Sequence, residues 1–187
     1  FTNIEQVIAC FTPGSMIMTS NGEVPVETLT EGDLVLTRAN GFQPIRWVGR
    51  RDLSSQELAA TPIFNPVKIS AGALGRNLPE RDMLVSPQHR MLVANTRSEL
   101  LFGEHEVLVA ATHMTVLEGV EVVKAQEISY IHFMFDQHEI VRADGAWTES
   151  FQPGLRTMAG LGEAQRAEIC ALFPELANST GFAGARL

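Results

Sequence analysis

The sequence predicts an all-β protein, and three observations lead to that prediction. Short runs of apolar and β-branched residues recur along most of the chain at the length of strands. Turn-forming residues separate the runs, among them Asn40 with Gly41, and Asp144 with Gly145. Only the part beyond Pro153 shows the spacing of apolar residues that is typical of a helix. Many short strands of this kind indicate a sandwich or a complex barrel.

The first elements in chain order are a hairpin and a series of short strands. Alternation of apolar and polar residues over Gly22–Leu36, with turn residues at Asn21 and Gly32, predicts a strand pair with a hairpin turn. Asp52–Asn65 is expected to be a polar loop with one helical turn. Further strands are expected at Ile45–Val48, Val67–Ser70, Met83–Val85, Arg90–Ala94, Val107–Ala110, Val120–Ala125, Glu127–Phe135 and Glu139–Ala143. A short amphipathic helix is expected within Gly162–Leu176, followed by a small, polar tail.

Length and charge limit the domain count and the classes of partner. At ~150 residues per domain, 187 residues leave room for one domain and a small appendage. The net charge of −8 disfavours nucleic acid or an anionic membrane as the main partner, because both attract a basic surface. No apolar run reaches the ~18 residues of a membrane span. Two cysteines far apart, Cys10 and Cys170, make no disulfide framework, and the compartment stays open.

Two segments carry residues that are suited to acyl chemistry. Cys10 lies just ahead of the predicted hairpin, where the turn Thr12–Ser15 can hold its thiol at the edge of a sheet. An isolated cysteine is commonly a small buried hydrophobe, so position alone does not assign it a role. Ser86 and His89 lie three residues apart across a proline-initiated turn between two apolar strands. A hydroxyl and an imidazole that point at one spot can hold and polarise a peptide bond, although a turn histidine often only faces solvent.

Two further histidines are candidates. His132 and His138 are six residues apart, which places them on one face if a single strand runs through both and Gln137 does not interrupt it. Either could instead be structural. Convergence of Cys10, His89, His132 and His138 on Zn²⁺ is an alternative, but the chain has no C-x-x-C or H-x-x-x-H spacing.

Three segments in chain order resemble the Hint superfamily, the Hedgehog and intein autoprocessing fold. The run CFTPGSMI from Cys10 and the hairpin GEVPVETLTEGDLV after it are similar to the first splicing block, in which a nucleophilic cysteine precedes a hairpin. SPQH, from Ser86 to His89, resembles the second block, normally Thr-x-x-His. HEIVRADG, from His138, resembles the late block. The resemblance extends to about Phe151, and the residues of these motifs are most similar to those of bacterial stand-alone, intein-like domains.

The resemblance implies a horseshoe-shaped all-β fold and one reaction. The Cys10 thiolate attacks the carbonyl carbon of Ala9, and an N-to-S acyl shift turns the amide into a thioester. The departing amine needs a proton, for which His89 is the candidate donor. Ser86 is expected to hold the scissile peptide or its oxyanion. A second base, loosely aligned with His132, could deprotonate the thiol, because a pKa of ~8.5 leaves little thiolate at pH 7.

The resemblance also divides the chain and defines its partners. It implies an upstream segment over residues 1–9, a Hint domain over 10–151 and a C-terminal extension with a short helix and a frayed tail over 152–187. The substrate is then the chain's own flanking segment, and water, a thiol or an amine accepts the acyl group. No cofactor, metal, nucleic acid or membrane span is expected. Such a domain cleaves itself once and is not a turnover enzyme.

The end of the matched region departs from a splicing intein. Inteins end in His-Asn followed by a nucleophile, whereas this chain has Glu149 and Ser150 followed by Phe151, which has no nucleophilic group. Full splicing is therefore not expected, and what remains is cleavage or transfer in the manner of Hedgehog domains. Nothing resembles a sterol-recognition region. Two other readings stay open: a degenerate, non-catalytic module for binding or display, and a Cys10/His89 peptidase that acts on other proteins.

Overall fold

The computed structural model describes residues 9–94 and 106–151 of the chain. The prediction of an all-β domain is confirmed, because strands dominate these residues and the single α-helix, α1 (Ser55–Ala60), is short. Turns of 3-10 helix occupy Val26–Thr28, Pro62–Phe64 and Ala111–Val116. The strands are β1 (Met16–Thr19), β2 (Gly22–Pro25), β3 (Leu34–Thr37), β4 (Gly41–Pro44), β5 (Trp47–Leu53), β6 (Val67–Ile69), β7 (Met83–Val85), β8 (Arg90–Val93), β9 (Val107–Ala110), β10 (Val120–Val122), β11 (Ile128–Met134), β12 (Ile140–Ala143) and β13 (Ala146–Glu149).

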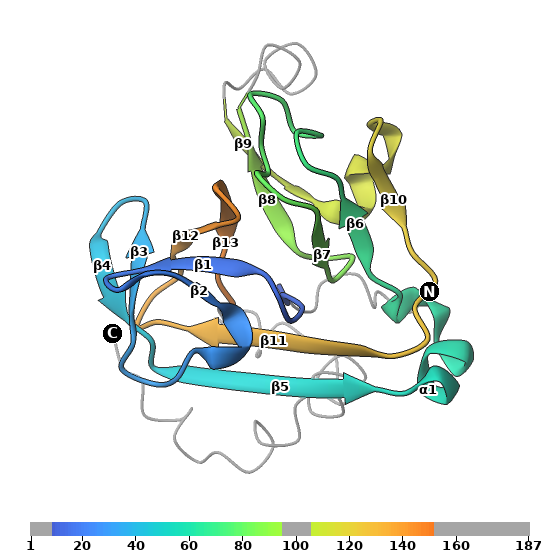
Figure 1. Ribbon diagram of the computed structural model, residues 1–187, viewed down its shortest axis with the longest axis horizontal. Coiled ribbons are helices and arrows are strands. Elements are labelled where there is room, and N and C mark those ends of the chain that lie inside the picture. The colour runs from blue at the N-terminus through green and yellow to red at the C-terminus, as the bar shows by residue number, and fades with distance from the viewer. Residues whose placement is uncertain (1–8, 95–105, 152–187) are drawn as a thin grey trace.

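The strands form three groups, and all the pairings are antiparallel. The largest sheet has the order β2-β1-β3-β12-β13-β8-β9, with β4 beside β3. A second group has the order β10-β6-β7, and the third is the pair β11-β5. Figure 1 shows β5 and β11 as the two longest strands, running side by side below the other strands. The pairing of β13 with β8 joins the end of the described chain to its middle.

The predicted hairpin over Gly22–Leu36 is wrong in its pairing. The strands at its two ends, β2 and β3, both pair with β1, which lies between them. The tight hairpin is formed by β1 and β2, with Thr19 opposite Gly22, where φ is +90°. A 3-10 turn at Val26–Thr28 then interrupts the alternation and sends the chain to the other side of β1.

One residue, Phe11, links two of the strand groups. It bridges to Val85 in β7 on one side and to Ile131 in β11 on the other. Its N–H donates to the Ile131 carbonyl at 2.7 Å, and the Ile131 N–H donates back at 2.8 Å. The buried Phe11 ring stacks on Phe133 with the ring centres 5.5 Å apart. The chain therefore runs between β7 and β11 one residue after Cys10.

The main apolar core lies where the sheets face each other. Burial of these side chains is the dominant favourable contribution to folding. Its fully buried members come from strands of all three groups and from the connections between strands, and they include Ile17, Val26, Val35, Ile45, Val67, Ile69, Met83, Val85, Met91, Ile131, Phe133 and Val141.

Several predictions concern residues outside the described part. The helix expected within Gly162–Leu176, the polar tail after it and Cys170 all lie there. Within residues 9–94 and 106–151, no helix has the length and apolar character needed to cross a membrane.

Candidate functional site

The side chain of Cys10 is buried in an apolar environment, 3% exposed. It packs with four other residues in a group that we call the thiol cluster: Cys10, Leu53, Leu58, Tyr130 and Phe151. Burial raises the pKa of the Cys10 thiol well above its ordinary value, and a hydrogen bond with Ser86 offsets this only in part. The resting side chain is therefore a neutral thiol.

Helix α1 and the turn after it cover the thiol cluster. Ser54 begins the helix with a capping box, in which its hydroxyl accepts the Glu57 N–H and the Glu57 carboxylate accepts the Ser54 N–H. Leu58, on the buried side of α1, joins the cluster. The Tyr130 hydroxyl donates to the Phe64 carbonyl at 2.6 Å, which ties the turn to β11.

Ser86 holds both polar groups of the Cys10 main chain. The Cys10 N–H, which belongs to the Ala9–Cys10 amide, donates to the Ser86 hydroxyl at 3.0 Å. The Ser86 N–H donates to the Cys10 carbonyl at 3.1 Å. Thr12 adds a further anchor, because its hydroxyl donates to the Leu84 carbonyl at 2.7 Å. The Ser86 side chain thus contacts the nitrogen side of the bond, where a leaving amine would develop.

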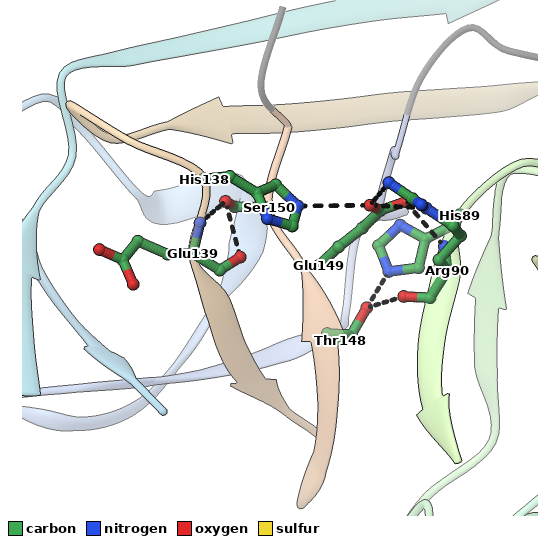
Figure 2. Close-up of polar contacts among 7 residues, drawn as sticks. All are labelled: His89, Arg90, His138, Glu139, Thr148, Glu149 and Ser150. Carbon is green, nitrogen blue, oxygen red and sulfur yellow. Dashed lines mark hydrogen bonds and ion pairs between the residues drawn. The ribbon is translucent and has the colours of Figure 1, made fainter. Parts of the chain in front are cut away.

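His89 is fully buried beside this segment. The main-chain N–H of His89 donates to the Ser86 carbonyl at 3.0 Å. The His89 ring packs edge to face against the Phe11 ring, with the centres 4.6 Å apart. The ring Nε2 is hydrogen-bonded to the hydroxyl of Thr148 in β13 (Figure 2). Burial lowers the pKa of His89 to about 4, with the Arg90 charge acting in the same direction and the Glu149 charge opposing. The imidazole is therefore neutral at pH 7.

His132 lies in β11, opposite Gly49 of β5, and is fully buried. Its ring packs against Trp47 and against Phe151 of the thiol cluster, with ring centres 4.7 Å apart in each case. A Cβ at Gly49 would lie 2.6 Å from the His132 ring, so glycine is needed here for space. Burial lowers the pKa of His132 well below its ordinary value.

His138 does not share a strand face with His132. Strand β11 ends at Met134 and β12 begins at Ile140, so His138 lies in the connection between them. The condition for a common face, a single strand through both histidines, is not met, because the strand does not continue through that connection. The half-exposed His138 ring instead faces Glu149, with 3.4 Å between Nε2 and Oε2.

A charged group that the sequence reasoning missed lies next to His89. Glu149, at the end of β13, is 5% exposed, and Arg90 holds its carboxylate with a closest separation of 2.6 Å between Nη2 and Oε2 (Figure 2). The Arg90 N–H also donates to it, at 3.1 Å. We call Arg90, His138 and Glu149 the charged network. Burial pushes the Glu149 pKa upward, but hydrogen bonds from His138 and Arg90 and the nearby charges outweigh it, and the pKa is lowered.

The Ser150 hydroxyl is hydrogen-bonded to the main chain of Glu139. It donates to the Glu139 carbonyl at 2.9 Å and accepts the Glu139 N–H at 3.0 Å. Asp144 is likewise used in the turn between β12 and β13, where φ is +46° and its carboxylate accepts the Met16 N–H at 3.2 Å. These bonds hold the last hairpin against its neighbours.

The convergence of four residues on Zn²⁺ is not found. Within the described residues, which include Cys10, His89, His132 and His138, no group of three or more cysteine, histidine or acidic side chains is placed to hold a metal ion. Cys10, Ser86 and His89 are brought together, His132 reaches the thiol cluster through Phe151, and His138 is placed with Glu149.

Comparison with known proteins gives a family and several similar structures. The model of the Hint domain family matches residues 9–155. A bacterial intein-like domain from Clostridium thermocellum is 15% identical with a TM-score of 0.47, over 77% of this chain and 99% of that chain. A DnaB intein from Synechocystis is 7% identical with a TM-score of 0.47, over 78% and 100%. A gp41-1 intein variant is 13% identical with a TM-score of 0.47, over 75% and 98%. No curated protein gives a significant match.

Proposed function

The chain belongs to the Hint domain family, and on that premise we propose that it performs an N-to-S acyl shift at the Ala9–Cys10 bond. Its fold is an all-β Hint fold, and domains of this type are in general autoprocessing domains. We assign the domain to residues 10–151, with residues 1–9 as the upstream segment and 152–187 as a C-terminal extension. The thioester formed would then be open to hydrolysis or transfer.

The observation that carries the proposal is the contact between Ser86 and the Cys10 amide. A peptide nitrogen whose N–H is held at 3.0 Å by a buried hydroxyl has a fixed orientation next to its own thiol. The Ser86 N–H donates to the Cys10 carbonyl at 3.1 Å, so Ser86 fixes the Cys10 main chain on both sides of its Cα. The nucleophile's own amide is thus the peptide bond presented to the sulfur.

The reaction can proceed without gain or loss of protons. The Cys10 thiol gives up its proton and its sulfur bonds to the Ala9 carbonyl carbon. The bond from that carbon to the Cys10 nitrogen then breaks, and the nitrogen leaves as an amine that carries the proton. His89, with a pKa lowered to about 4, is neutral at the start and must first accept the thiol proton. It therefore acts as a relay, where the sequence suggested only a donor.

His132 and His138 are not equally well placed to assist the acyl shift as a second base. His132 is the candidate second base, because its ring packs against Phe151 of the thiol cluster. His138 is a weaker candidate, because its ring faces Glu149. Ser150, whose hydroxyl is bonded to the Glu139 main chain, supports the expectation that full splicing does not occur.

One observation favours a second candidate function, a non-catalytic module for binding or display. The thiol is buried and its pKa is raised, while the pKa of His89 is lowered. Both shifts disfavour the thiolate and imidazolium pair through which the relay passes. Under the proposed function the same burial makes the acyl shift slow until something opens the thiol cluster. The same burial argues against a peptidase that acts on other proteins.

Intact mass followed over time on the purified full chain tests the proposal. With dithiothreitol or hydroxylamine present, we expect loss of everything upstream of Cys10. Cys10→Ala should abolish the loss, and His89→Gln should slow it about 10²- to 10⁴-fold, the usual contribution of a general acid–base group. Cys170→Ala is the matched control, since it removes the other thiol and should leave the rate unchanged.

An unchanged mass over days, in a chain whose circular dichroism shows β structure, would contradict the acyl shift. It would leave the non-catalytic module as the function. Cleavage of an added peptide that depends on Cys10 would instead indicate a peptidase.

A further inference from the structure

Thr148 lies at the point where β13 meets β8. Its side chain is fully buried, and in the ladder it is paired with Met91, two residues beyond His89. The hydroxyl therefore lies between the His89 ring and the main chain of Arg90, as Figure 2 shows. Nothing in the sequence reasoning assigned Thr148 a role, because the strand that carries it was not predicted.

The hydrogen bonds of Thr148 determine where its proton lies. The Thr148 oxygen is 3.1 Å from the Arg90 carbonyl oxygen, and two oxygens at this separation attract only with a hydrogen between them. A carbonyl has no proton to give, so the threonine hydroxyl is the donor. Having used its one proton, the hydroxyl can only accept from the His89 Nε2 with which it is also in contact.

His89 is therefore held in one tautomer. A neutral imidazole carries one proton, and the acceptor at Thr148 places that proton on Nε2. The other nitrogen, Nδ1, then has a lone pair. Nδ1 is buried and has no hydrogen-bond partner among the described residues. A buried lone pair without a partner is costly to retain, and such groups are often found where chemistry uses them.

The His89 ring lies beside the segment that carries the reacting bond. His89 meets the Phe11 ring with the centres 4.6 Å apart, one residue beyond the nucleophile. Its main chain is bonded to Ser86, which in turn holds the Cys10 amide. The tautomer of this ring therefore decides which nitrogen is free to move a proton in the site.

We propose that Thr148 is a positioning residue for the acyl shift: it holds His89 in the Nε2–H form and so makes Nδ1 the nitrogen that carries the thiol proton to the Cys10 amine. The inference rests on the proposed function. In the balanced step, Nδ1 takes the proton from sulfur as the sulfur–carbon bond forms. Nδ1–H then gives it to the Cys10 nitrogen as the carbon–nitrogen bond breaks, and the ring returns to its starting tautomer.

The test combines nitrogen NMR of the His89 ring with the rate of cleavage in the full chain. Thr148→Val keeps the shape of the side chain and removes the hydroxyl, while Thr148→Ser keeps the hydroxyl. We expect a protonated Nε2 in the parent chain and in Thr148→Ser, and a mixture of tautomers in Thr148→Val. Cleavage should slow about 10- to 100-fold in Thr148→Val, as when a partner that orients a histidine is lost, and recover in Thr148→Ser.

Thr37→Val is the matched control. Thr37 is a buried threonine whose hydroxyl donates to the Gly41 carbonyl at 2.6 Å in the turn between β3 and β4. It measures what loss of a buried threonine hydroxyl does to the fold. We expect it to leave both the tautomer and the cleavage rate unchanged.

The outcomes separate this inference from the proposed function. A proton on Nδ1 in the parent chain, or an unchanged tautomer in Thr148→Val, overturns the inference whatever the rate. A changed tautomer with an unchanged rate overturns the positioning role alone. A parent chain that forms no thioester overturns the acyl shift and the positioning role with it, and the NMR data still show whether Thr148 sets the tautomer.

Discussion

The thiol cluster is buried, and so is Glu149 of the charged network, yet the pKa values of Cys10 and Glu149 are shifted in opposite directions. In the thiol cluster the surroundings of Cys10 are apolar, and burial raises the pKa of its thiol. In the charged network, Glu149 is buried too, but Arg90 and His138 lower its pKa against the effect of burial. Depth alone therefore does not decide charge. The partners decide it: Ser86 offsets the effect of burial on Cys10 only in part, whereas Arg90 and His138 outweigh that effect at Glu149.

The pKa of His89, like that of Cys10, is shifted mainly by burial. The Glu149 charge favours its protonation, but burial dominates and lowers its pKa to about 4. At pH 7 both the imidazole of His89 and the thiol of Cys10 are therefore neutral. The charged network holds the strands in place around His89.

The largest expected effect is a loss of stability in acid that is due to His89. In the unfolded chain its imidazole takes up a proton near pH 6.5, whereas in the folded chain it does so only near pH 4. The unfolded state thus binds more protons between these values, so stability falls as the pH is lowered through this window. From pH 7 to 4.5 the loss from His89 should be about 2 kcal/mol, and the lowered pKa of His132 adds to it.

Urea unfolding of the parent chain and of His89→Gln at both pH values measures this contribution. The variant should show the smaller loss. An equal loss in the two chains would mean that His89 is charged in the folded protein, and the contrast between the regions would no longer hold.

A smaller effect is expected from filling the space beside the thiol cluster. In Gly49→Ala the new Cβ would lie 2.3 Å from the Trp47 ring and 2.6 Å from the His132 ring, so both rings must move. We expect a loss of about 1–3 kcal/mol in free energy of unfolding, together with faster reaction of Cys10 with a thiol reagent. Stability equal to the parent, with unchanged thiol reactivity, would show that the packing of His132 does not shield the cluster.

The smallest effect tests the charged network against an exposed ion pair. Glu149→Gln leaves the hydrogen-bonding shape but removes the charge that Arg90 contacts, and we expect a loss of about 1–2 kcal/mol in free energy of unfolding. Asp136→Asn is the matched control, because the Arg46–Asp136 pair has side chains that are 55% and 72% exposed. Its loss should be below about 1 kcal/mol. Equal losses in urea unfolding would show that burial of Glu149 adds nothing.

Local sequence patterns predict the strands better than they predict the pairing. Met83–Val85 and Val107–Ala110 were predicted with the bounds observed, because each is a short apolar run with clear ends. The pairing around β1 was wrong, since alternation shows which face is buried but not which strand lies alongside. Strand pairing is a long-range property, and single runs of residues do not encode it.

The site shows the same limit. The family resemblance groups Cys10, Ser86 and His89, and in the structure Ser86 is hydrogen-bonded both to the Cys10 main chain and to the His89 main chain. It missed Thr148 and Glu149, which approach His89 and Arg90 only because β13 pairs with β8. The turn residues Asp144 and Gly145 after a predicted strand are a signal for a returning strand, but Ala146–Glu149 shows no alternation of apolar and polar residues that would define one.

The anchoring of Phe11 has a consequence for the molecule that remains after cleavage. Two hydrogen bonds join the main chains of Phe11 and Ile131, and a third runs from the Thr12 hydroxyl. All three involve residues that follow the Cys10 nitrogen in the chain. Release of the upstream part removes none of them, and the new amino terminus begins between β7 and β11. The proposed reaction would thus remove the upstream segment and leave these contacts intact. The product would be a folded domain with a free cysteine at its amino terminus.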